Sequence, residues 1–431
     1  MNINGILNTL ETSGNLRTLP GAVHEGRYLV ENGVKMLNLS SNDYLGLASD
    51  RVLIDAFFGS ADAGQLLLSS SSSRLLTGNF NVNETLEKHL AEAFGRPAAL
   101  TFGSGYAMNS GILPAVSDQG TLILADKLVH ASLIDGIRLS SARAIRFRHQ
   151  DFDSLERLVR ENAGKYSSII IVVESIYSMD GDVTDLRRLV ALKKEFPGVM
   201  LYVDEAHGIG VRGETGLGIA QEQGCIADVD FLCGTFGKAL ASVGAYVVCS
   251  NEIRSFLVNR MRSFIFTTAL PPLNVAWTDY VLRHLPEFSA RRNHLAKMSA
   301  VLRQELTSEG IPCPSESQIV PLMVGDSHDA VALAEYFRSC GFYLLPIRPP
   351  TVPEGTSRLR ISLTASVTEE DILQLINALH YHTHPRQSSN PAPTSSCEPA
   401  SPSCPAPTSS CESAPPSCPA PTGHLTPQKL L

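Results

Sequence analysis

An apolar run ends in glycines and a single lysine at residues 230–239, which read DFLCGTFGKA. Its length and its glycines predict a buried strand followed by a tight loop, with Lys238 near the end of the strand and inside the fold. A buried ammonium group is costly, and the cost falls if the amine is neutral or covalently bound as a Schiff base. Lys238 is therefore a candidate for carbonyl chemistry. The alternative is a lysine that extends from its loop into solvent.

A second apolar run, residues 199–208 with the sequence VMLYVDEAHG, delivers an aspartate in the same way. If the two strands are parallel neighbours, Asp204 and Lys238 reach the same edge of an α/β sheet, where such sheets bind ligands. A lysine, a buried carboxylate and the nearby His207 together suit pyridoxal phosphate. The lysine would form the Schiff base, Asp204 would keep the pyridine nitrogen protonated, and His207 could bond the phenolate oxygen.

Strands and helices alternate around these two runs, which is typical of a mostly parallel sheet wrapped by helices. The predicted strands of this large α/β domain are residues 98–102, 121–125, 144–147, 168–173, 199–203, 231–233 and 245–248. The predicted helices among them are residues 84–94, 153–162 and 185–195. Nearer the N-terminus, the pattern predicts a short helix at residues 6–12 and a β-hairpin at residues 27–39 that turns at residues 31–33.

The C-terminal part predicts a smaller α+β domain. Its predicted helices are residues 287–310, 329–339 and 368–380, and its predicted strands are residues 319–324, 342–345 and 358–363. We therefore expect an N-terminal segment at residues 1–50, a large cofactor-binding domain at 51–285, a small domain at 286–384 and a tail at 385–431.

The tail has a composition of its own. Residues 391–404 read PAPTSSCEPASPSC and residues 405–418 read PAPTSSCESAPPSC, a tandem repeat that places Cys397, Cys404, Cys411 and Cys418 seven positions apart. Sequence rich in Pro and Ser cannot bury enough apolar surface to order itself, so we expect a disordered appendage. A spacing of seven is not that of a metal knuckle, and we expect no metal site there.

Composition excludes several classes of protein. The chain has 431 residues and a formal net charge of −8, which argues against nucleic-acid binding. No apolar stretch reaches the length of a membrane span, and the N-terminus lacks the pattern of a signal peptide, so we expect a cytoplasmic protein. The cysteines of the body are scattered singly and indicate no disulfide framework.

Polar groups follow other predicted strands as well. Residues 102–109, FGSGYAMN, place Gly105 and Tyr106 at a helix N-terminus, whose free amides form a phosphate-sized anion site. His130 follows the strand at 121–125, where a histidine is either structural or functional. Glu174 and Ser178 lie at a strand end and would border the pocket.

Two arginines, Arg358 and Arg360, lie on a predicted strand of the small domain. Arginines at a strand edge are usually solvated. One that faces a cleft could instead bind a substrate carboxylate in bidentate fashion.

As a set, these motifs resemble the α-oxoamine synthases, a family of fold-type I pyridoxal phosphate enzymes. The resemblance covers about residues 15–383. It is carried by SNDYLG at 41–46, GSGY at 103–106, HAS at 130–132, SMDGD at 178–182, DEAHG at 204–208, TFGK at 235–238 and RPPTVP at 348–353. The resemblance implies an acyltransferase that works as a homodimer.

The resemblance also implies roles for individual residues. Lys238 would be the Schiff-base lysine, Asp204 the partner of the pyridine nitrogen, and His130 the residue stacked on the cofactor ring. The remaining cofactor contacts would be Gly105, Tyr106, Ser178, His207, Thr235 and Thr267, the last toward the phosphate of the partner subunit. Substrate would be bound by Arg17, His130, Thr351 and Arg360, with Arg360 holding the amino-acid carboxylate.

The reaction implied is a decarboxylative Claisen condensation of L-alanine with pimeloyl-CoA or a pimeloyl-carrier protein, a step of biotin biosynthesis. Relatives with the same machinery condense glycine with acetyl-CoA or succinyl-CoA, or serine with palmitoyl-CoA, and a non-catalytic scaffold is a further alternative. Such a scaffold would be expected to lose the lysine, and Lys238 is present. The chain departs from the family pattern at the serine-rich turn 70–73 and at Asn83, where a histidine is usual. In the family this loop lies near the substrate.

Overall fold

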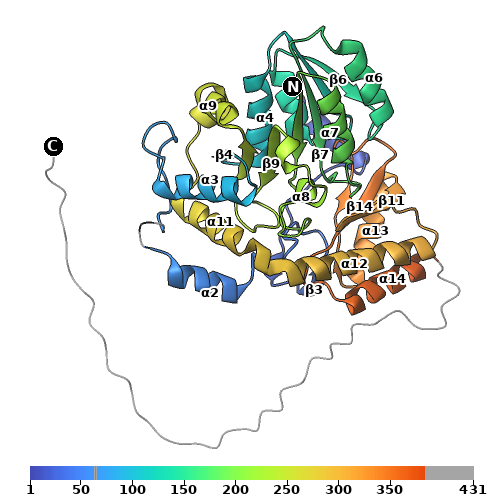
Figure 1. The fold of residues 1–431 in the computed structure, drawn as a ribbon. Coiled ribbons are helices and arrows are strands. Elements are labelled where there is room, and N and C mark those ends of the chain that lie inside the picture. Colours follow the sequence, from blue (N-terminus) through green and yellow to red (C-terminus); the bar gives the residue numbers. More distant parts are fainter. Residues whose placement is uncertain (63, 65, 384–431) are drawn as a thin grey trace, which may run out of the picture. The chain divides into compact units, whose positions relative to one another are not determined.

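The computed structural model describes residues 1–62, 64 and 66–383. Its central element is a seven-stranded sheet with the order β4-β10-β9-β8-β7-β5-β6 (Figure 1). The strands are β4 (Ala98–Phe102), β5 (Thr121–Asp126), β6 (Arg143–Phe147), β7 (Ser168–Glu174), β8 (Val199–Asp204), β9 (Phe231–Thr235) and β10 (Ala245–Cys249). Strands β9, β8, β7, β5 and β6 are parallel, whereas β10 runs antiparallel to both β4 and β9. The mostly parallel sheet predicted from the sequence is confirmed.

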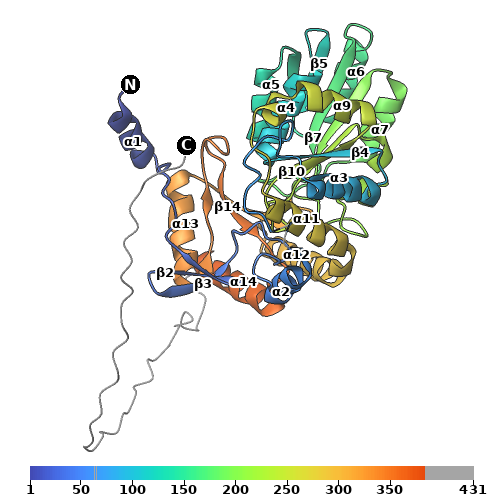
Figure 2. The same cartoon turned by 90° about the vertical axis from the view of Figure 1, so that its left-hand side faces the viewer.

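Helices cover both faces of this sheet (Figures 1 and 2). They include α3 (Asn81–Ala93), α4 (Gly105–Val116), α5 (Ala131–Leu139), α6 (Phe152–Asn162), α7 (Leu186–Glu195), α9 (Asn251–Arg260) and α11 (Pro272–His284). Alternate residues of β7 belong to different cores: Ile170 and Val172 pack in one, and Ile169 and Ile171 in the other. Burial on both faces explains why the strands read as continuous apolar runs.

Two smaller sheets adjoin the C-terminal helices. One has the antiparallel order β11-β14-β13, formed by Ile319–Gly325, Ser357–Ser362 and Pro346–Ile347. The other joins β1 (Val23–Glu25), β2 (Tyr28–Glu31) and β3 (Val34–Asn38) to β12 (Phe342–Tyr343). Because β12 pairs in parallel with β3, the predicted N-terminal hairpin shares a sheet with the C-terminal part of the chain (Figure 2).

The remaining helices complete the described chain. They are α1 (Ile3–Thr12), α2 (Arg51–Ser60), α8 (Ile219–Glu222), α10 (Arg262–Ile265), α12 (Ser289–Ser308), α13 (Ser327–Ser339), α14 (Glu369–Thr383) and 3₁₀ turns at Ile226–Asp228 and Leu285–Phe288. The helix predicted at 287–310 is therefore a 3₁₀ turn followed by α12. The strand predicted at 342–345 is shorter than expected, since only Phe342 and Tyr343 pair with β3.

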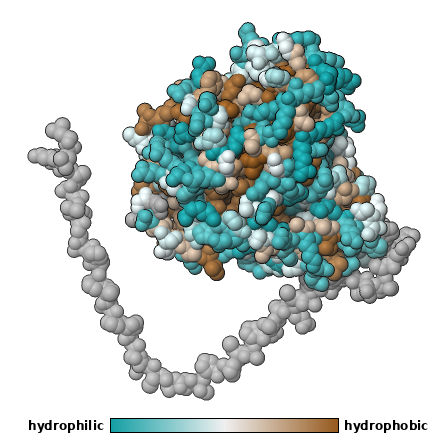
Figure 3. Space-filling view, in the orientation of Figure 1, coloured by the Kyte–Doolittle hydropathy of each residue, from teal (hydrophilic) through white to brown (hydrophobic). Residues whose placement is uncertain are grey.

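The structure also bears on the predictions about membrane spans, metal sites and cysteines. Among the described residues, no helix is long and apolar enough to cross a membrane, and no group of three potential ligands could hold a metal ion. The five body cysteines, Cys225, Cys233, Cys249, Cys313 and Cys340, are free. Polar and apolar residues are interspersed over the face drawn in Figure 3. The cysteine repeat lies outside the described residues, and the predicted domain boundaries remain predictions.

Candidate functional site

Three neighbouring parallel strands end at one edge of the sheet and deliver polar groups there. Glu174 at the end of β7 is in register with Asp204 at the end of β8, and Asp204 is in register with Cys233 of β9. Lys238 follows β9 by three residues. The two apolar runs are thus parallel neighbours, which meets the condition under which Asp204 and Lys238 reach the same edge.

The amine of Lys238 points into the protein and not into solvent. Its Nζ lies 2.8 Å from Nε2 of His207, which is itself buried. Burial lowers the pKa of Lys238 to about 8, although the carboxylates of Asp204 and Glu174 oppose this shift. With this pKa, the neutral and nucleophilic fraction of the amine near neutral pH is larger than for an ordinary lysine. The alternative of a lysine extended into solvent is wrong.

His207 links the amine of Lys238 to a tyrosine, which in turn bonds an arginine. Its Nδ1 lies 2.7 Å from the hydroxyl of Tyr44, which also accepts a hydrogen bond of 3.2 Å from Arg360. Burial and the positive charges of Lys238 and Arg360 lower the pKa of His207 well below its ordinary value, so the ring is neutral. The sequence contains no signal that the hydroxyl of Tyr44 contacts His207.

Asp204 is held by an asparagine on a different element. Its Oδ2 accepts a hydrogen bond of 2.7 Å from Nδ2 of Asn109 on α4, and its Oδ1 accepts one of 2.9 Å from the amide of Ala206. Asn109 in turn accepts a hydrogen bond of 2.7 Å from the hydroxyl of Tyr202. Asp204 and Lys238, both in the described chain, do not form a direct ion pair, which leaves them as separate groups facing one site. Sequence reasoning missed Asn109.

His130 lies at the N-terminus of α5 and is open to solvent on one side. Its Nδ1 is 2.7 Å from the hydroxyl of Ser132, and its amide donates a 2.5 Å hydrogen bond to Glu174. Because Ser132 also accepts a hydrogen bond from Asn109, His130 and Asp204 belong to one hydrogen-bonded network. Desolvation lowers the pKa of His130, which favours the neutral ring.

Two buried glutamates adjoin this network. Burial and the charge of Asp204 raise the pKa of Glu174 to about 8. Burial raises the pKa of Glu205 to about 7, although Ser175 and the amide of Ala220 bond its carboxylate. Glu174 borders the site, as predicted. Glu205, the residue after Asp204, is joined by its carboxylate to Ser175 and to the amide of Ala220 in α8.

The N-terminus of α4 is the position at which the sequence predicts an anion site. Ser104 caps the helix by accepting a hydrogen bond of 3.1 Å from the amide of Ala107. A Cβ added to Gly105 would lie 3.7 Å from Cβ of Thr235, so Thr235 stands beside the first turn. The hydroxyl of Tyr106 donates to Asp135, and the side chain is 51% exposed.

Arg360 is only 8% exposed and connects the small sheet with the large one. Its Nε donates a 2.5 Å hydrogen bond to the carbonyl of Ser178. Arg358, on the same strand, pairs with Asp180 and is 5% exposed. Both arginines are buried, so the expectation that strand-edge arginines are solvated is wrong here. The carbonyl oxygen of Ser178 faces Arg360, and the cofactor contact predicted for Ser178 stays a prediction.

Arg17 and Thr351 lie together. The guanidinium of Arg17 donates hydrogen bonds of 3.1 Å to the hydroxyl of Thr351 and to the carbonyls of Arg348 and Pro349. Thr351 lines an open cleft of about 720 Å³ whose wall also includes Ala131, beside His130. Other lining residues are Tyr177, Met179, Asp180 and Arg358. The cleft thus extends from the His130 segment to the Arg348–Pro353 loop.

Thr267 lies apart from these residues. It lines a small cavity with Arg74, Asn83 and Phe102, and its side chain is exposed. Asn83 itself lies in the first turn of α3 and accepts a hydrogen bond of 3.1 Å from the amide of Phe80, the residue that caps the helix. In this chain the residue that replaces the usual histidine therefore stabilises a helix terminus.

These groups fit pyridoxal phosphate. A neutralisable buried amine (Lys238) and a buried carboxylate (Asp204) face one site without pairing to each other. A helix N-terminus at Gly105 offers amides for a phosphate, and His130 is exposed beside it. Each group that the cofactor needs is therefore present.

Comparison with known proteins supports the same conclusion. The model of the aminotransferase class I and II family matches residues 34–379. A relative from Glaesserella parasuis is 55% identical over 374 residues, 86% of this chain and 98% of its own, and one from Haemophilus influenzae is 52% identical with the same coverage. Both are named "Putative 8-amino-7-oxononanoate synthase".

Solved structures agree with these relatives. Serine palmitoyltransferase of Sphingomonas wittichii superposes with a TM-score of 0.81 at 32% identity, covering 89% of this chain and 96% of the other. The S. paucimobilis serine palmitoyltransferase, which carries a pyridoxal phosphate–myriocin adduct, superposes with a TM-score of 0.81 at 28% identity and covers 89% and 97%. The 8-amino-7-oxononanoate synthase of Francisella tularensis gives 0.67 at 25% identity, with 81% and 98% covered.

The chain therefore belongs to the aminotransferase class I and II family and has the fold of the fold-type I pyridoxal phosphate enzymes. Within that family it is an α-oxoamine synthase, an acyltransferase that depends on pyridoxal phosphate.

Proposed function

We propose that the enzyme condenses L-alanine with a pimeloyl thioester, on CoA or a carrier protein, to give 8-amino-7-oxononanoate, CO2 and the free thiol, in biotin biosynthesis. The Cα of alanine forms a bond with the thioester carbon, and the C–S bond breaks with the thiol leaving. The bond between Cα and the carboxylate breaks to release CO2, and a proton takes its place. The names and identities of the relatives support this choice of substrates.

Pyridoxal phosphate, when bound, withdraws electrons from the amino-acid Cα and so makes loss of its proton and of CO2 feasible. Lys238 would hold the cofactor covalently, Asp204 would pair with its ring nitrogen, and His207 and Ser178 would lie near its phenolate oxygen. The start of α4, with Gly105, would bind the phosphate. We also assign Tyr106, Thr235 and Thr267 to the cofactor pocket.

The chain's own residues would position the substrate and move its protons. Arg360 is directed toward the site by its bonds to Ser178 and Tyr44 and would bind the alanine carboxylate. Lys238, once free, has a pKa of about 8 and can accept the Cα proton. His130 would cover the cofactor ring. Arg17 and Thr351, at the cleft, would contact the acyl substrate.

The observation that carries this proposal is the Lys238–His207–Tyr44–Arg360 series of contacts, which joins the amine to the carboxylate-binding cation. The test incubates the purified holoenzyme with L-alanine, glycine or L-serine and with pimeloyl, acetyl, succinyl or palmitoyl thioester, and follows thiol release. We expect turnover with L-alanine and pimeloyl thioester, and its loss in Lys238→Ala together with the visible absorbance of bound cofactor. Preference for another pair would reassign the enzyme within the family.

A homodimer is proposed from the family resemblance, and light scattering on the purified protein tests it. A cytoplasmic location and the domain boundaries at residues 50, 285 and 384 also stay predictions.

A further inference from the structure

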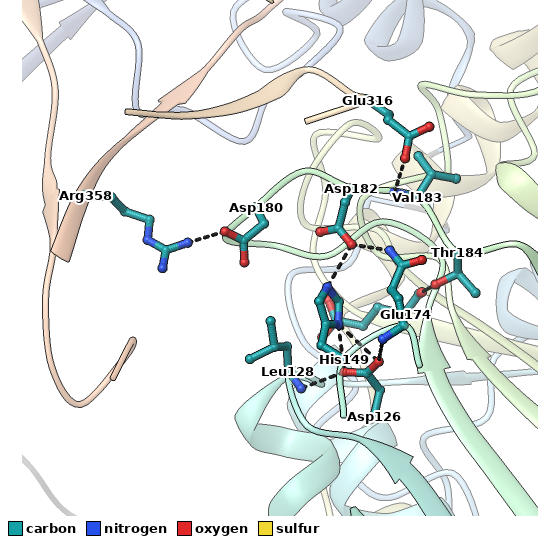
Figure 4. A network of polar contacts seen from close by, with 11 residues as sticks. Asp126, Leu128, His149, Glu174, Asp180, Asp182, Val183, Thr184, Glu316 and Arg358 are labelled. Carbon is teal, nitrogen blue, oxygen red and sulfur yellow. Dashed lines mark hydrogen bonds and ion pairs between the residues drawn. The ribbon is translucent and has the colours of Figure 1, made fainter. Parts of the chain in front are cut away.

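His149 lies between two carboxylates that come from different parts of the chain (Figure 4). Its Nδ1 is 2.9 Å from Oδ1 of Asp126, and its Nε2 is 2.9 Å from Oδ2 of Asp182. Its ring and that of Tyr177 pack edge to face, with ring centres 4.4 Å apart. With both nitrogens on carboxylates, both must carry protons to donate, so the side chain is an imidazolium.

Asp126 connects His149 to the segment that carries His130. It ends β5, and its Oδ1 also accepts a hydrogen bond of 2.8 Å from the amide of Leu128. Its Oδ2 accepts one of 2.9 Å from the amide of Gln150. Asp126 therefore holds the side chain of His149, the amide of Gln150 that follows it, and the start of the loop that leads to His130.

Asp182 connects His149 to the turn at residues 177–182. The turn is closed by hydrogen bonds from the amide of Tyr177 to the carbonyl of Asp182 (3.1 Å) and from the amide of Gly181 to the carbonyl of Tyr177 (2.9 Å). It also carries the two groups that bond the arginines of β14: the Ser178 carbonyl and the Asp180 carboxylate. Figure 4 shows the Asp180–Arg358 pair on the side of the turn that faces β14.

We propose that His149 is a positioning residue for amino-acid binding, which acts by holding the 177–182 turn so that the Ser178 carbonyl orients Arg360. Nothing in the proposed chemistry uses His149 directly. The inference rests on the proposed role of Arg360 as the carboxylate-binding residue.

The geometry makes this turn dependent on His149. Among the described residues, Oδ1 of Asp182 is buried without a hydrogen-bond partner, and its Oδ2 bonds only the side chains of His149 and Gln150. Loss of the imidazolium would leave a buried carboxylate without a charged partner, which favours a displaced turn. The Ser178 carbonyl would move with it.

The test compares wild type with His149→Asn and Asp182→Asn, which break the same contact from its two sides. In each variant we expect KM for L-alanine to rise about tenfold while kcat changes less than about threefold, because ground-state binding is lost and the chemistry is retained. The Kd of L-alanine for the holoenzyme without acyl donor, measured by absorbance titration, should rise by the same factor. The double variant should resemble the single ones, since both remove one contact.

The control is His89→Asn, which removes another histidine–carboxylate pair, 2.6 Å from Asp279, that joins α3 and α11. It should leave KM and Kd for L-alanine unchanged. Folded His149→Asn and Asp182→Asn proteins that bind L-alanine like wild type would overturn the proposal, even if less stable. If one of these two variants does not fold, L-alanine binding by the other variant tests the proposal. Failure of the proposed function gives a different result: wild-type holoenzyme would not bind L-alanine.

Discussion

Asn109 is the residue through which α4 contacts Asp204, the proposed partner of the cofactor nitrogen. It donates the 2.7 Å hydrogen bond to Oδ2 of Asp204 and is 2% exposed. A hydrogen bond to a charged group contributes about 1.5–3 kcal/mol, so Asn109→Ala should raise the Kd of pyridoxal phosphate for the apoenzyme about tenfold or more. Fluorescence titration measures this. Asn259→Ala, which removes an exposed amide bonded to its own helix, is the control, and an equal Kd in both variants would show that Asn109 has no such role.

Because of His149, the free energy of unfolding should also depend on pH. The charged groups that face the His149 ring are Asp126 and Asp182, and the Tyr177 ring packs beside it. Although desolvation opposes the shift, the two carboxylates raise the pKa of His149 to about 10, above its ordinary 6.5. The stability contributed by its protonation is therefore fully present below pH 6.5 and is lost as the pH rises through about 10.

The measurement is the free energy of unfolding in urea at several pH values for wild type and His149→Asn. Because Lys238 and Glu174 titrate in the same range, the difference between the two proteins isolates His149. The advantage of wild type should shrink from pH 7 toward pH 10. A constant difference would mean that His149 is not protonated in the folded state.

At the scale of elements, the site depends on the close approach of α4 and α5. A Cβ added to Gly136 of α5 would lie 2.4 Å from the carbonyl oxygen of Asn109 on α4. Gly136→Ala should push the helices apart, destabilise the fold by about 1–3 kcal/mol and weaken cofactor binding, because His130 begins α5. Urea unfolding measures the first effect. Gly59→Ala in α2 has no atom within 4 Å of its new Cβ and should be neutral or stabilising. Equal stability in both variants would contradict this argument.

The sequence was most informative where both faces of an element are buried. The apolar runs predicted each of the seven central strands within one or two residues, because parallel strands covered on both sides read as continuous hydrophobic stretches. Helix α11, which follows Pro271, was not among the predicted helices. In the structure Pro272 is its first residue, where the missing amide costs nothing.

The site could be predicted only where a polar residue ends a strand. Asp204, Glu174 and Lys238 follow apolar runs, so the topology alone brings them together. Tyr44 and Asn109 could not be found in this way. Each reaches its partner from another element, 163 positions away for Tyr44 and 95 for Asn109, and no local spacing encodes such a contact.

At the scale of the whole molecule, the site is assembled from nearly the entire length of the described chain. Tyr44 comes from the N-terminal part, His207 from the centre and Arg360 from the last strand. The family match ends at residue 379 and α14 at Thr383. Both therefore end before the cysteine repeat at residues 391–418 begins.

A stop codon after Thr383 should therefore leave kcat and KM within about twofold of wild type and the unfolding midpoint unchanged. A stop after Ser366 is the contrasting variant, since it removes α14 with the buried Ile372 and Leu375. Burial of such side chains contributes about 1.5–3 kcal/mol each, and α14 also holds Asp371, which pairs with Arg27 at 2.7 Å. A typical domain is stable by only about 5–15 kcal/mol, so this shorter chain should not fold. If the longer truncated protein kept its midpoint but lost turnover with one thioester donor, the repeat would have to take part in recognising that donor.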